Sequence, residues 1–281
     1  MNAASINARL KSYSDKLNRN HHYTIIRFLQ ERLLYRLSQS HYRENLWLKG
    51  GALTYTYGLE ETRYTKDIDF LLSKLKSSHE TIVRIFREIG AMQFPDGVDY
   101  LVGELTIADM QKEGRYRGVR VKMPGRIGNV REVVQIDIGV GDHVTPGPQL
   151  IQYPTLLDGF EPPELYAYSL ETSLAEKFEA MIALGEYNSR MKDFYDVYYL
   201  LPKCDDQQLA QAVRNTFARR KTPLIANHPL FTPPFYTDKR RWTQWNLFIR
   251  KNELQPVDFP EIGARMKIAL EPIYHGLLEN K

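Results

Sequence analysis

The spacing of apolar residues changes along the chain and predicts two kinds of region. Two early segments, 23–37 and 77–89, carry apolar side chains at the three- and four-residue spacing of amphipathic helices. Shorter strand-like runs lie around them, at 45–49, 66–72, 100–107, 118–123 and 132–140. Beyond residue 163 the spacing is helical again, at 173–184, 190–201, 207–219 and 262–278. The pattern predicts an α/β (α+β) chain, with a sheet domain followed by a mostly helical C-terminal domain.

Residues 142–163 are rich in proline and glycine and separate the two regions. Such composition is typical of a domain boundary, and a length of 281 residues suits two domains. We therefore expect one domain over residues 1–150, with an N-terminal helix ahead of its sheet, and a helical domain over residues 151–281.

The strand expected at 66–72 carries two acids on one face. Asp67 and Asp69 are two residues apart, so their side chains point to the same side of the strand. Two adjacent carboxylates repel each other, and a cation between them would relieve the repulsion. Because carboxylate oxygens are ligands that Mg²⁺ prefers, we interpret the pair as a metal site.

Gly50 and Gly51 lie between a short strand at 45–49 and a helix expected at 52–57. Glycine permits close backbone approach, so a glycine pair that leads into a helix can direct N–H groups at a phosphate. Lys49 can reach the same phosphate, although a lysine at a strand end is also commonly a solvated charge. Phosphate and metal groups together indicate a nucleoside triphosphate site.

A third carboxylate is expected to complete such a site, and the strand at 132–140 supplies it. Val134, Ile136 and Ile138 share one face of this strand, whereas Asp137 points to the other. An acid between two isoleucines lies in a partly buried sheet and needs a partner there. That partner is either the metal or a neighbouring arginine in a salt bridge.

Two helices of the C-terminal region carry further candidates. Lys177 lies at the edge of an apolar helix face, where it either snorkels to solvent or projects into a cleft. Asp193 and Asp196 share a face of the next helix, where they pair locally with Arg190 or Lys192 or have a functional role.

Basic residues gather in two parts of the chain. The first part holds Lys112, Arg115, Arg117, Arg120, Lys122, Arg126 and Arg131. It is either a solvated sheet face or a contact for an RNA backbone or a triphosphate. The second holds Arg219, Arg220 and Lys221, then Lys239, Arg240, Arg241 and Trp242. Basic residues beside tryptophan suit single-stranded RNA, whereas the spacing of Trp245 and Phe248 predicts core positions.

Composition narrows the function classes. A formal charge of +4 permits a polyanionic partner, and a single cysteine, Cys204, excludes an intrachain disulfide. There is no zinc-binding spacing, no GxxxxGK[ST] and no complete GxGxxG, which disfavours zinc, P-loop and Rossmann sites. Because no apolar segment is long enough for a signal or a membrane span, we expect a cytoplasmic protein with no membrane partner.

Taken in order, several motifs resemble a known family. They are LKGGALxxxYGL, TKDIDF, VQIDIG, SLAEKFEAM, RMKDFYDVYYLL, NTFARRKTPL and a late QWxxF. Over residues 46–275 the chain resembles the AbiEii/AbiGii nucleotidyltransferase toxin family, relatives of the MenT toxins. The resemblance implies a DNA polymerase β-like nucleotidyltransferase domain with a mixed sheet, then a helical domain, in a toxin–antitoxin or phage-defence system.

The resemblance also implies roles for single residues. Gly50 and Gly51 would hold the triphosphate, and Asp67 and Asp69 would bind the metals. Asp137 would complete the metal site and help to deprotonate the attacking hydroxyl. Nucleotide phosphates would be contacted by Lys177, and the cleft would be lined by Lys192 and Asp193. The chain departs from its relatives at Ala52, since related sequences carry Ser or Thr in or just after the glycine pair.

The expected activity is a Mg²⁺-dependent transfer of NMP from NTP, with two Mg²⁺ ions, to the 3′ end of tRNA, which would inhibit translation. An antitoxin encoded nearby is the expected protein partner. Two alternatives stay open at this point. One is NMP transfer to a protein hydroxyl, and the other is a non-catalytic homologue that binds a nucleotide or RNA.

Overall fold

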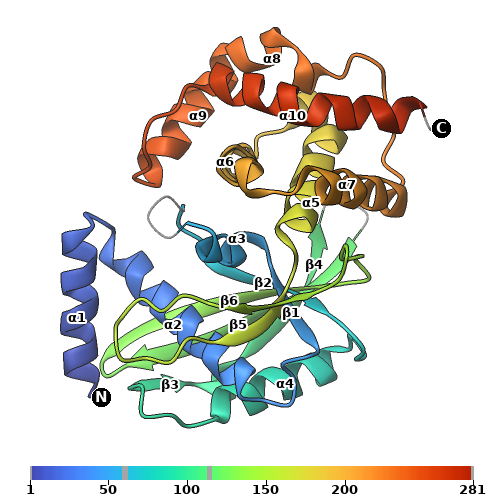
Figure 1. Ribbon diagram of the computed structural model, residues 1–281. Coiled ribbons are helices and arrows are strands. Elements are labelled where there is room, and N and C mark those ends of the chain that lie inside the picture. Colours follow the sequence, from blue (N-terminus) through green and yellow to red (C-terminus); the bar gives the residue numbers. More distant parts are fainter. Residues whose placement is uncertain (1, 59–62, 113–115, 280–281) are drawn as a thin grey trace. The chain divides into compact units, whose positions relative to one another are not determined.

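A computed structural model describes residues 2–58, 63–112 and 116–279. The chain divides into two compact units (Figure 1). The first consists of residues 1–56, 64–142 and 149–167, and the second of residues 57–63, 143–148 and 168–281. Each unit has its own core, built as the apolar spacing predicts, and each is described by itself below.

The first unit is built on a mixed sheet. Within the described residues the sheet has eight strands, in the order β3-β5-β6-β2-β1-β8-β7, with β4 paired to β5. The strands are β1 (Leu46–Lys49), β2 (Asp67–Leu72), β3 (Val98–Tyr100), β4 (Thr106–Lys112), β5 (Tyr116–Ile127), β6 (Val130–Val140), β7 (Gln149–Gln152) and β8 (Glu164–Ala167). The pairs β2–β6 and β1–β8 are parallel and the others antiparallel, which confirms the mixed sheet.

One expectation about a strand needs correction. The single strand expected at 100–107 is wrong, because a 3₁₀ turn at Val102–Glu104 separates β3 from β4. The sheet also continues beyond residue 150, since β7 and β8 lie within residues 149–167, which group with the first unit. The division into two domains stays a prediction.

Helices cover the apolar face of the sheet. The helices of this unit are α1 (Ala3–Lys16), α2 (His21–Ser38), α3 (Gly50–Leu53) and α4 (His79–Ala91). Of these, α2 and α4 lie on the apolar face, whereas α3 begins at Gly50, beside Asp69 on the other face (Figure 1). The rings of Phe70 on β2 and Phe86 on α4 lie 6.4 Å apart, and Ile136 and Ile138 of β6 are buried beside them. Because side chains alternate across a strand, Asp67, Asp69 and Asp137 point to the opposite face.

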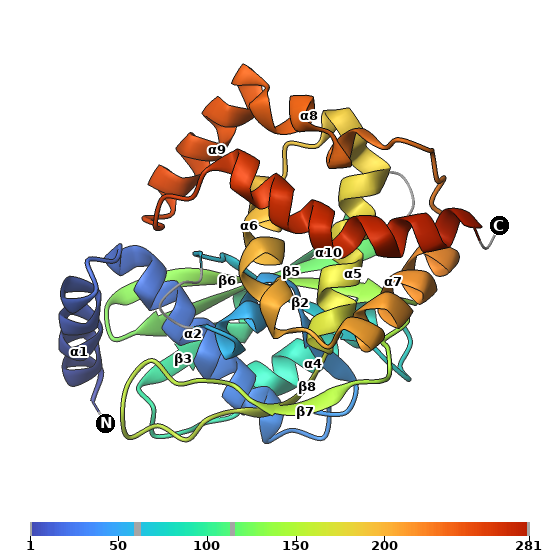
Figure 2. The ribbon, with the colours of Figure 1, turned by 45° about the horizontal axis from the view of Figure 1, so that its top comes forward.

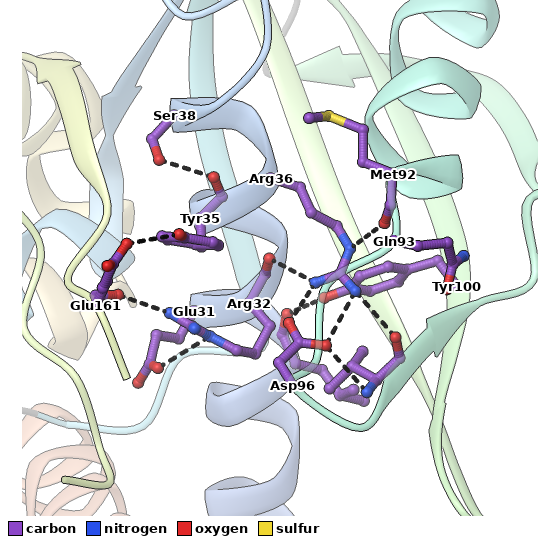
Figure 3. Close-up of polar contacts among 12 residues, drawn as sticks. Glu31, Arg32, Tyr35, Arg36, Ser38, Met92, Gln93, Asp96, Tyr100 and Glu161 are labelled. Atoms are coloured by element: carbon purple, nitrogen blue, oxygen red, sulfur yellow. Dashed lines mark hydrogen bonds and ion pairs between the residues drawn. The ribbon is translucent and has the colours of Figure 1, made fainter. Parts of the chain in front are cut away.

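The polar side of α2 is buried as well, which the helical spacing did not predict. Figure 3 shows Arg36 at the centre of a polar network. Its guanidinium binds both oxygens of Asp96, at 2.7 and 3.1 Å, and donates to the carbonyls of Met92, Arg32 and Val98. A buried charge of this kind is tolerated because every donor has a partner.

One turn earlier on α2, Glu31 is also buried. Its carboxylate accepts a hydrogen bond from the backbone N–H of Leu156 at 2.6 Å and lies 3.2 Å from Nε of Arg32. Burial raises the pKa of Glu31 to about 7, although the positive charge of Arg32 acts to lower it. Arg32 in turn donates to the carbonyl of Glu161, so that α2 is tied to the loop before β8 (Figure 3).

The second unit is helical, as expected. Its helices are α5 (Leu170–Leu184), α6 (Met191–Leu200), α7 (Asp206–Arg220), α8 (Pro233–Thr237), α9 (Lys239–Lys251) and α10 (Phe259–Glu279), coloured yellow to red in Figure 2. Aromatic rings fill the core, with Phe194 and Trp245 each 5.3 Å from Phe259. Trp245 is buried, as its spacing predicts. Among the described residues, every helix is too short or too polar to cross a membrane.

We predict that Arg36→Ala lowers the free energy of unfolding by about 3 to 5 kcal/mol, because Asp96 is left buried without its counter-charge. Urea denaturation followed by circular dichroism measures this change. Arg87→Ala, at an exposed position of α4, should change stability by about 0.5 kcal/mol or less. Equal effects of the two substitutions would contradict a structural role for the network.

Candidate active site

A row of charged side chains crosses the sheet on the side away from α2 and α4. The strand register places Arg120 of β5 opposite Asp137 of β6, Asp137 opposite Asp69 of β2, and Asp69 opposite Lys49 of β1. Residues that pair across strands present their side chains on the same face. The two central acids are therefore flanked by two cations. We call this side of the sheet the carboxylate face.

A second row follows on the same face, two residues along each strand. It places Lys122 opposite Gln135, and Gln135 opposite Asp67. Thr65 lies just before β2, and its hydroxyl donates a hydrogen bond to Oδ1 of Asp67 at 3.0 Å. This hydrogen bond orients the Asp67 carboxylate. Asp67 and Asp69 share a face as the alternation predicts, and Asp137 joins them through the parallel pairing of β2 with β6.

Gly50 lies against Asp69, and the space shows why glycine is needed there. A Cβ atom built on Gly50 would lie 2.1 Å from Oδ2 of Asp69, and the backbone has a φ of +66°. Both features exclude other residues without rearrangement. The neighbouring Gly51 is buried in the first turn of α3, where its carbonyl accepts a hydrogen bond from the Thr54 hydroxyl at 2.7 Å. Close approach to a carboxylate is thus one reason for glycine at position 50.

Asp137 and Arg120 form a two-point ion pair. Nε of Arg120 lies 2.7 Å from Oδ1 of Asp137, and Nη2 lies 2.8 Å from Oδ2. The Asp137 side chain is 3% exposed and that of Arg120 is 35% exposed. The hydrogen bonds to Asp137 raise the pKa of Arg120, with further contributions from Asp137, Asp67 and Asp69 that outweigh burial. The salt bridge considered for Asp137 from the sequence is therefore formed.

The three carboxylates offer the type of oxygen ligand that a divalent cation prefers. They lie on one face, Asp69 directly opposite Asp137, and carboxylate oxygens are suitable ligands for Mg²⁺. Over the described ranges, however, His, Cys, Asp and Glu side chains do not form a group of three arranged to hold a metal ion. Both oxygens of Asp137 accept hydrogen bonds from Arg120. Asp67, Asp69 and Asp137 could hold a cation once Asp137 turns from Arg120.

Lys49 has a partner that the sequence did not indicate. Its ammonium lies 2.6 Å from Oδ2 of Asp142, and both side chains are largely buried. Asp142 follows β6 and Gly141, whose φ is +81°, so the turn after the strand brings this acid to Lys49. No local pattern links two residues so far apart in the chain. The expected contact of Lys49 with phosphate stays a prediction.

In the second unit, Lys177 of α5 contacts two acids of α6. Its ammonium lies 2.7 Å from Asp196 and 3.2 Å from Asp193. Arg63 binds both oxygens of Asp196, at 3.0 and 2.9 Å, and Nε of Arg190 lies 2.7 Å from Asp193. Lys177, Asp193, Asp196 and Arg63 are buried. The sequence named Arg190 as a partner of these acids but missed Arg63, which lies 133 residues from Asp196.

The charges in this cluster stabilise one another. Burial by itself raises the pKa of Asp196, but Arg63 and Lys177 outweigh it and lower that pKa to about 2. Burial likewise lowers the pKa of Lys177, and Asp196 and Asp193 outweigh it, so the pKa lies above its usual value. Lys192, expected to line a cleft together with Asp193, is exposed, whereas its neighbour Asp193 is buried.

The basic residues of the sheet divide into paired and exposed ones. Nε of Arg126 lies 3.2 Å from Asp99, and Arg131 pairs with Glu104. Lys122 is exposed. Arg115 lies outside the described residues, as do the side chains of Lys112 and Arg117. Salt bridges on a solvated face therefore account for part of this basic region.

Helix α9 presents a basic surface. Its exposed cations are Lys239, Arg240, Arg250 and Lys251, and Trp242 on the same helix is 53% exposed. Arg241 is different, because it is buried, donates to the carbonyl of Glu186 at 2.6 Å and lies over the ring of Phe235. In the cluster at 219–221, Arg220 is tied to Glu179 at 2.6 Å. Exposed cations beside an exposed tryptophan are suited to a nucleic acid backbone and its bases.

Solved structures share this fold. One is a crystal structure of a protein from Helicobacter pylori proposed to be a nucleotidyltransferase. It is 14% identical, with a TM-score of 0.52 over 93% of this chain and 99% of that chain. The other is JHP933 from Helicobacter pylori, which is 13% identical, with a TM-score of 0.53 over 93% of this chain and 95% of that chain. At this identity the likeness establishes the fold, and the expected fold class is confirmed.

The class of enzyme follows from the family. The model of the nucleotidyl transferase AbiEii toxin family, of type IV toxin–antitoxin systems, matches residues 32–265. The chain belongs to this family and is a nucleotidyltransferase, which confirms the resemblance seen in the motifs. The family implies a nucleoside triphosphate substrate, typically a divalent metal, and an antitoxin. No curated protein matches the chain.

We predict that Gly50→Ala lowers the free energy of unfolding by about 1 to 3 kcal/mol. The added methyl group meets the Asp69 carboxylate, and alanine is strained at this positive φ. Urea denaturation measures the loss, with Gly103→Ala as the matched control, since a Cβ there meets open space. A Gly50→Ala protein as stable as its control would show that Asp69 can move aside freely.

We predict that Asp196→Asn makes the free energy of unfolding less dependent on pH in the acid range. The pKa of Asp196, about 2, lies below its usual value of 3.8. The charged form therefore stabilises the fold above about pH 4, and this contribution is lost as the pH falls through about 2. Asp196→Asn should cost about 2 to 3 kcal/mol at pH 7 and progressively less below pH 4.

Urea denaturation at a series of pH values checks this prediction. Asp158→Asn, at an exposed position, serves as the control and should follow the wild-type curve to within about 0.5 kcal/mol. A loss in Asp196→Asn that stays constant from neutral to acid pH would rule out ionic stabilisation by this carboxylate.

Proposed function

We propose that the protein transfers NMP from an NTP to the 3′-terminal hydroxyl of tRNA, with Mg²⁺ as the metal, and so inhibits translation. The observation that carries this proposal is the carboxylate face, where the register brings Asp67, Asp69 and Asp137 together beside Gly50. The family supplies nucleotidyl transfer and the toxin setting. The metal, the acceptor and the effect on translation are the parts proposed here.

Each acid on the carboxylate face has a proposed task. Asp67 and Asp69 hold the metal ions, and Asp137 completes the site and helps to remove the proton from the attacking hydroxyl. When bound, two Mg²⁺ ions supply charge neutralisation at the α-phosphate and the leaving pyrophosphate. Thr65 keeps Asp67 oriented through its hydrogen bond, which pre-organises the site before substrate arrives.

Further residues are proposed for nucleotide binding. Backbone N–H groups at Gly50 and Gly51 hold the triphosphate, and the ammonium of Lys49 adds positive charge near it. Lys177 is held in a fixed position by Asp193 and Asp196, which suits a lysine that positions phosphates. Lys192, being exposed, is suited to a looser electrostatic contact.

Helix α9 supports a nucleic acid acceptor. Its four exposed cations and the exposed ring of Trp242 provide charge for phosphates and a platform for a base. A protein acceptor does not require such a surface. A tRNA acceptor would be met in the cytoplasm, the compartment expected from the sequence.

Incubation with total tRNA, Mg²⁺ and each α-labelled NTP in turn tests the proposal on a denaturing gel. A labelled tRNA band is expected with one or more nucleotides and should disappear with EDTA. Asp67→Asn and Asp69→Asn should each reduce labelling at least about a hundredfold, because transition-state charge is no longer neutralised. Asp99→Asn, at an exposed position of the same sheet, should label tRNA as wild type does.

Other outcomes separate the alternatives. Label on protein instead of tRNA would establish transfer to a protein hydroxyl. If no nucleotide gives label although the protein binds NTP or tRNA, the non-catalytic homologue becomes the correct description. Labelling that survives both Asp67→Asn and Asp69→Asn would remove the carboxylate face from the mechanism.

A further inference from the structure

Arg120 occupies one end of the charged row on the carboxylate face. Its guanidinium makes two parallel hydrogen bonds to Asp137, at 2.7 and 2.8 Å. This two-point geometry is the most specific way in which arginine binds a carboxylate. Both oxygens of Asp137 are therefore engaged by a side chain of the protein itself.

The two partners differ in their access to solvent. Asp137 is 3% exposed, whereas Arg120 is 35% exposed. Asp69 lies opposite Asp137 in the strand register, on the same face as Arg120. Arg120 is thus the more exposed partner of a buried carboxylate.

This arrangement leaves the carboxylate face short of positive charge. Arg120 and Lys49 flank the row, but Lys49 also lies 2.6 Å from a further acid, Asp142, so the acids outnumber these two cations. The excess negative charge attracts a further cation. Asp137, however, has fewer lone pairs to offer while it accepts two bonds from Arg120. A cation placed beside the guanidinium would also be repelled by it. Asp137 therefore cannot serve both partners fully.

We propose that Arg120 is an internal counter-ion that competes with the divalent cation for Asp137. In the metal-free protein Arg120 holds the buried carboxylate in place and limits its repulsion with Asp69. Once displaced, the guanidinium, which already reaches the solvent edge, is available to the anionic oxygens of the triphosphate. Arg120 thus acts as a positioning residue first and a nucleotide contact afterwards. The inference rests on the proposed metal site.

Binding of Mn²⁺ alone to the full-length protein, measured by calorimetry without nucleotide, tests this competition. Arg120→Lys keeps the charge but loses the two-point geometry, and should bind Mn²⁺ about threefold to tenfold more tightly than wild type. Arg120→Gln loses the charge too and should bind about tenfold more tightly or better. Adding Asp137→Asn to either variant should abolish the gain. Arg126→Gln, on the same strand and paired with exposed Asp99, should bind as wild type does.

A second measurement separates competition from simple support of the fold. With saturating Mn²⁺, Arg120→Gln should bind a non-hydrolysable NTP analogue about tenfold more weakly, since the freed guanidinium is missing. Metal affinity and nucleotide affinity then change in opposite directions. A purely structural role for Arg120 would weaken both.

Three results would overturn the inference. If neither Arg120 variant binds Mn²⁺ more tightly, while Asp69→Asn loses Mn²⁺ binding, the metal site stands and the competition fails. If Arg120→Gln binds Mn²⁺ more tightly and Arg120→Lys does not, the positive charge of Arg120 alone opposes the metal. Competition for the oxygens of Asp137 is then wrong. If wild type and both variants bind no Mn²⁺, the proposed metal site itself fails. Should Arg120→Gln not fold, Arg120→Lys carries the metal test alone.

Discussion

The constraint on which the first unit depends is the pairing of β2 with β6. Their parallel register sets Asp69 opposite Asp137, with Asp67 two residues away. Like charges at this spacing oppose folding unless cations are provided. The sheet provides them from its neighbouring strands, Arg120 from β5 and Lys49 from β1. The same crowding of carboxylates that costs stability is what makes this face suited to a metal and a triphosphate.

The close approach of Gly50 to Asp69 belongs to the same constraint. A side chain at residue 50 would occupy the position of the carboxylate, so the turn after β1 and the acid on β2 depend on each other. This gives Gly50 a structural role beside its proposed contact with phosphate. The positive φ that glycine permits at residue 50 thus leaves room for the Asp69 carboxylate.

Elsewhere in the chain, buried ionic groups join segments that are distant in sequence. Arg36 and Asp96 do this in the first unit, and Arg63 and Asp196 do it in the second. Each cation is surrounded by acceptors, which offsets the cost of removing it from water. Such pairs specify one packing arrangement among many that an apolar core alone would permit, since a misplaced partner leaves a buried charge.

The sequence by itself determined the longer amphipathic helices (α2, α4, α5, α6, α7 and α10), the strands β1, β2, β5 and β6, and the side of the strand on which each acid of β2 and β6 lies. These depend on alternation over a few residues, which is visible in any strand or helix taken alone. Ordered motifs also sufficed to identify the family. The tertiary structure decided the partners: Arg120 for Asp137, Asp142 for Lys49, and Arg63 for Asp196. It also split the strand expected at 100–107 and buried the polar side of α2. These ion-pair partners depend on strand register and on packing between distant segments. The spacing of residues along the chain predicts neither.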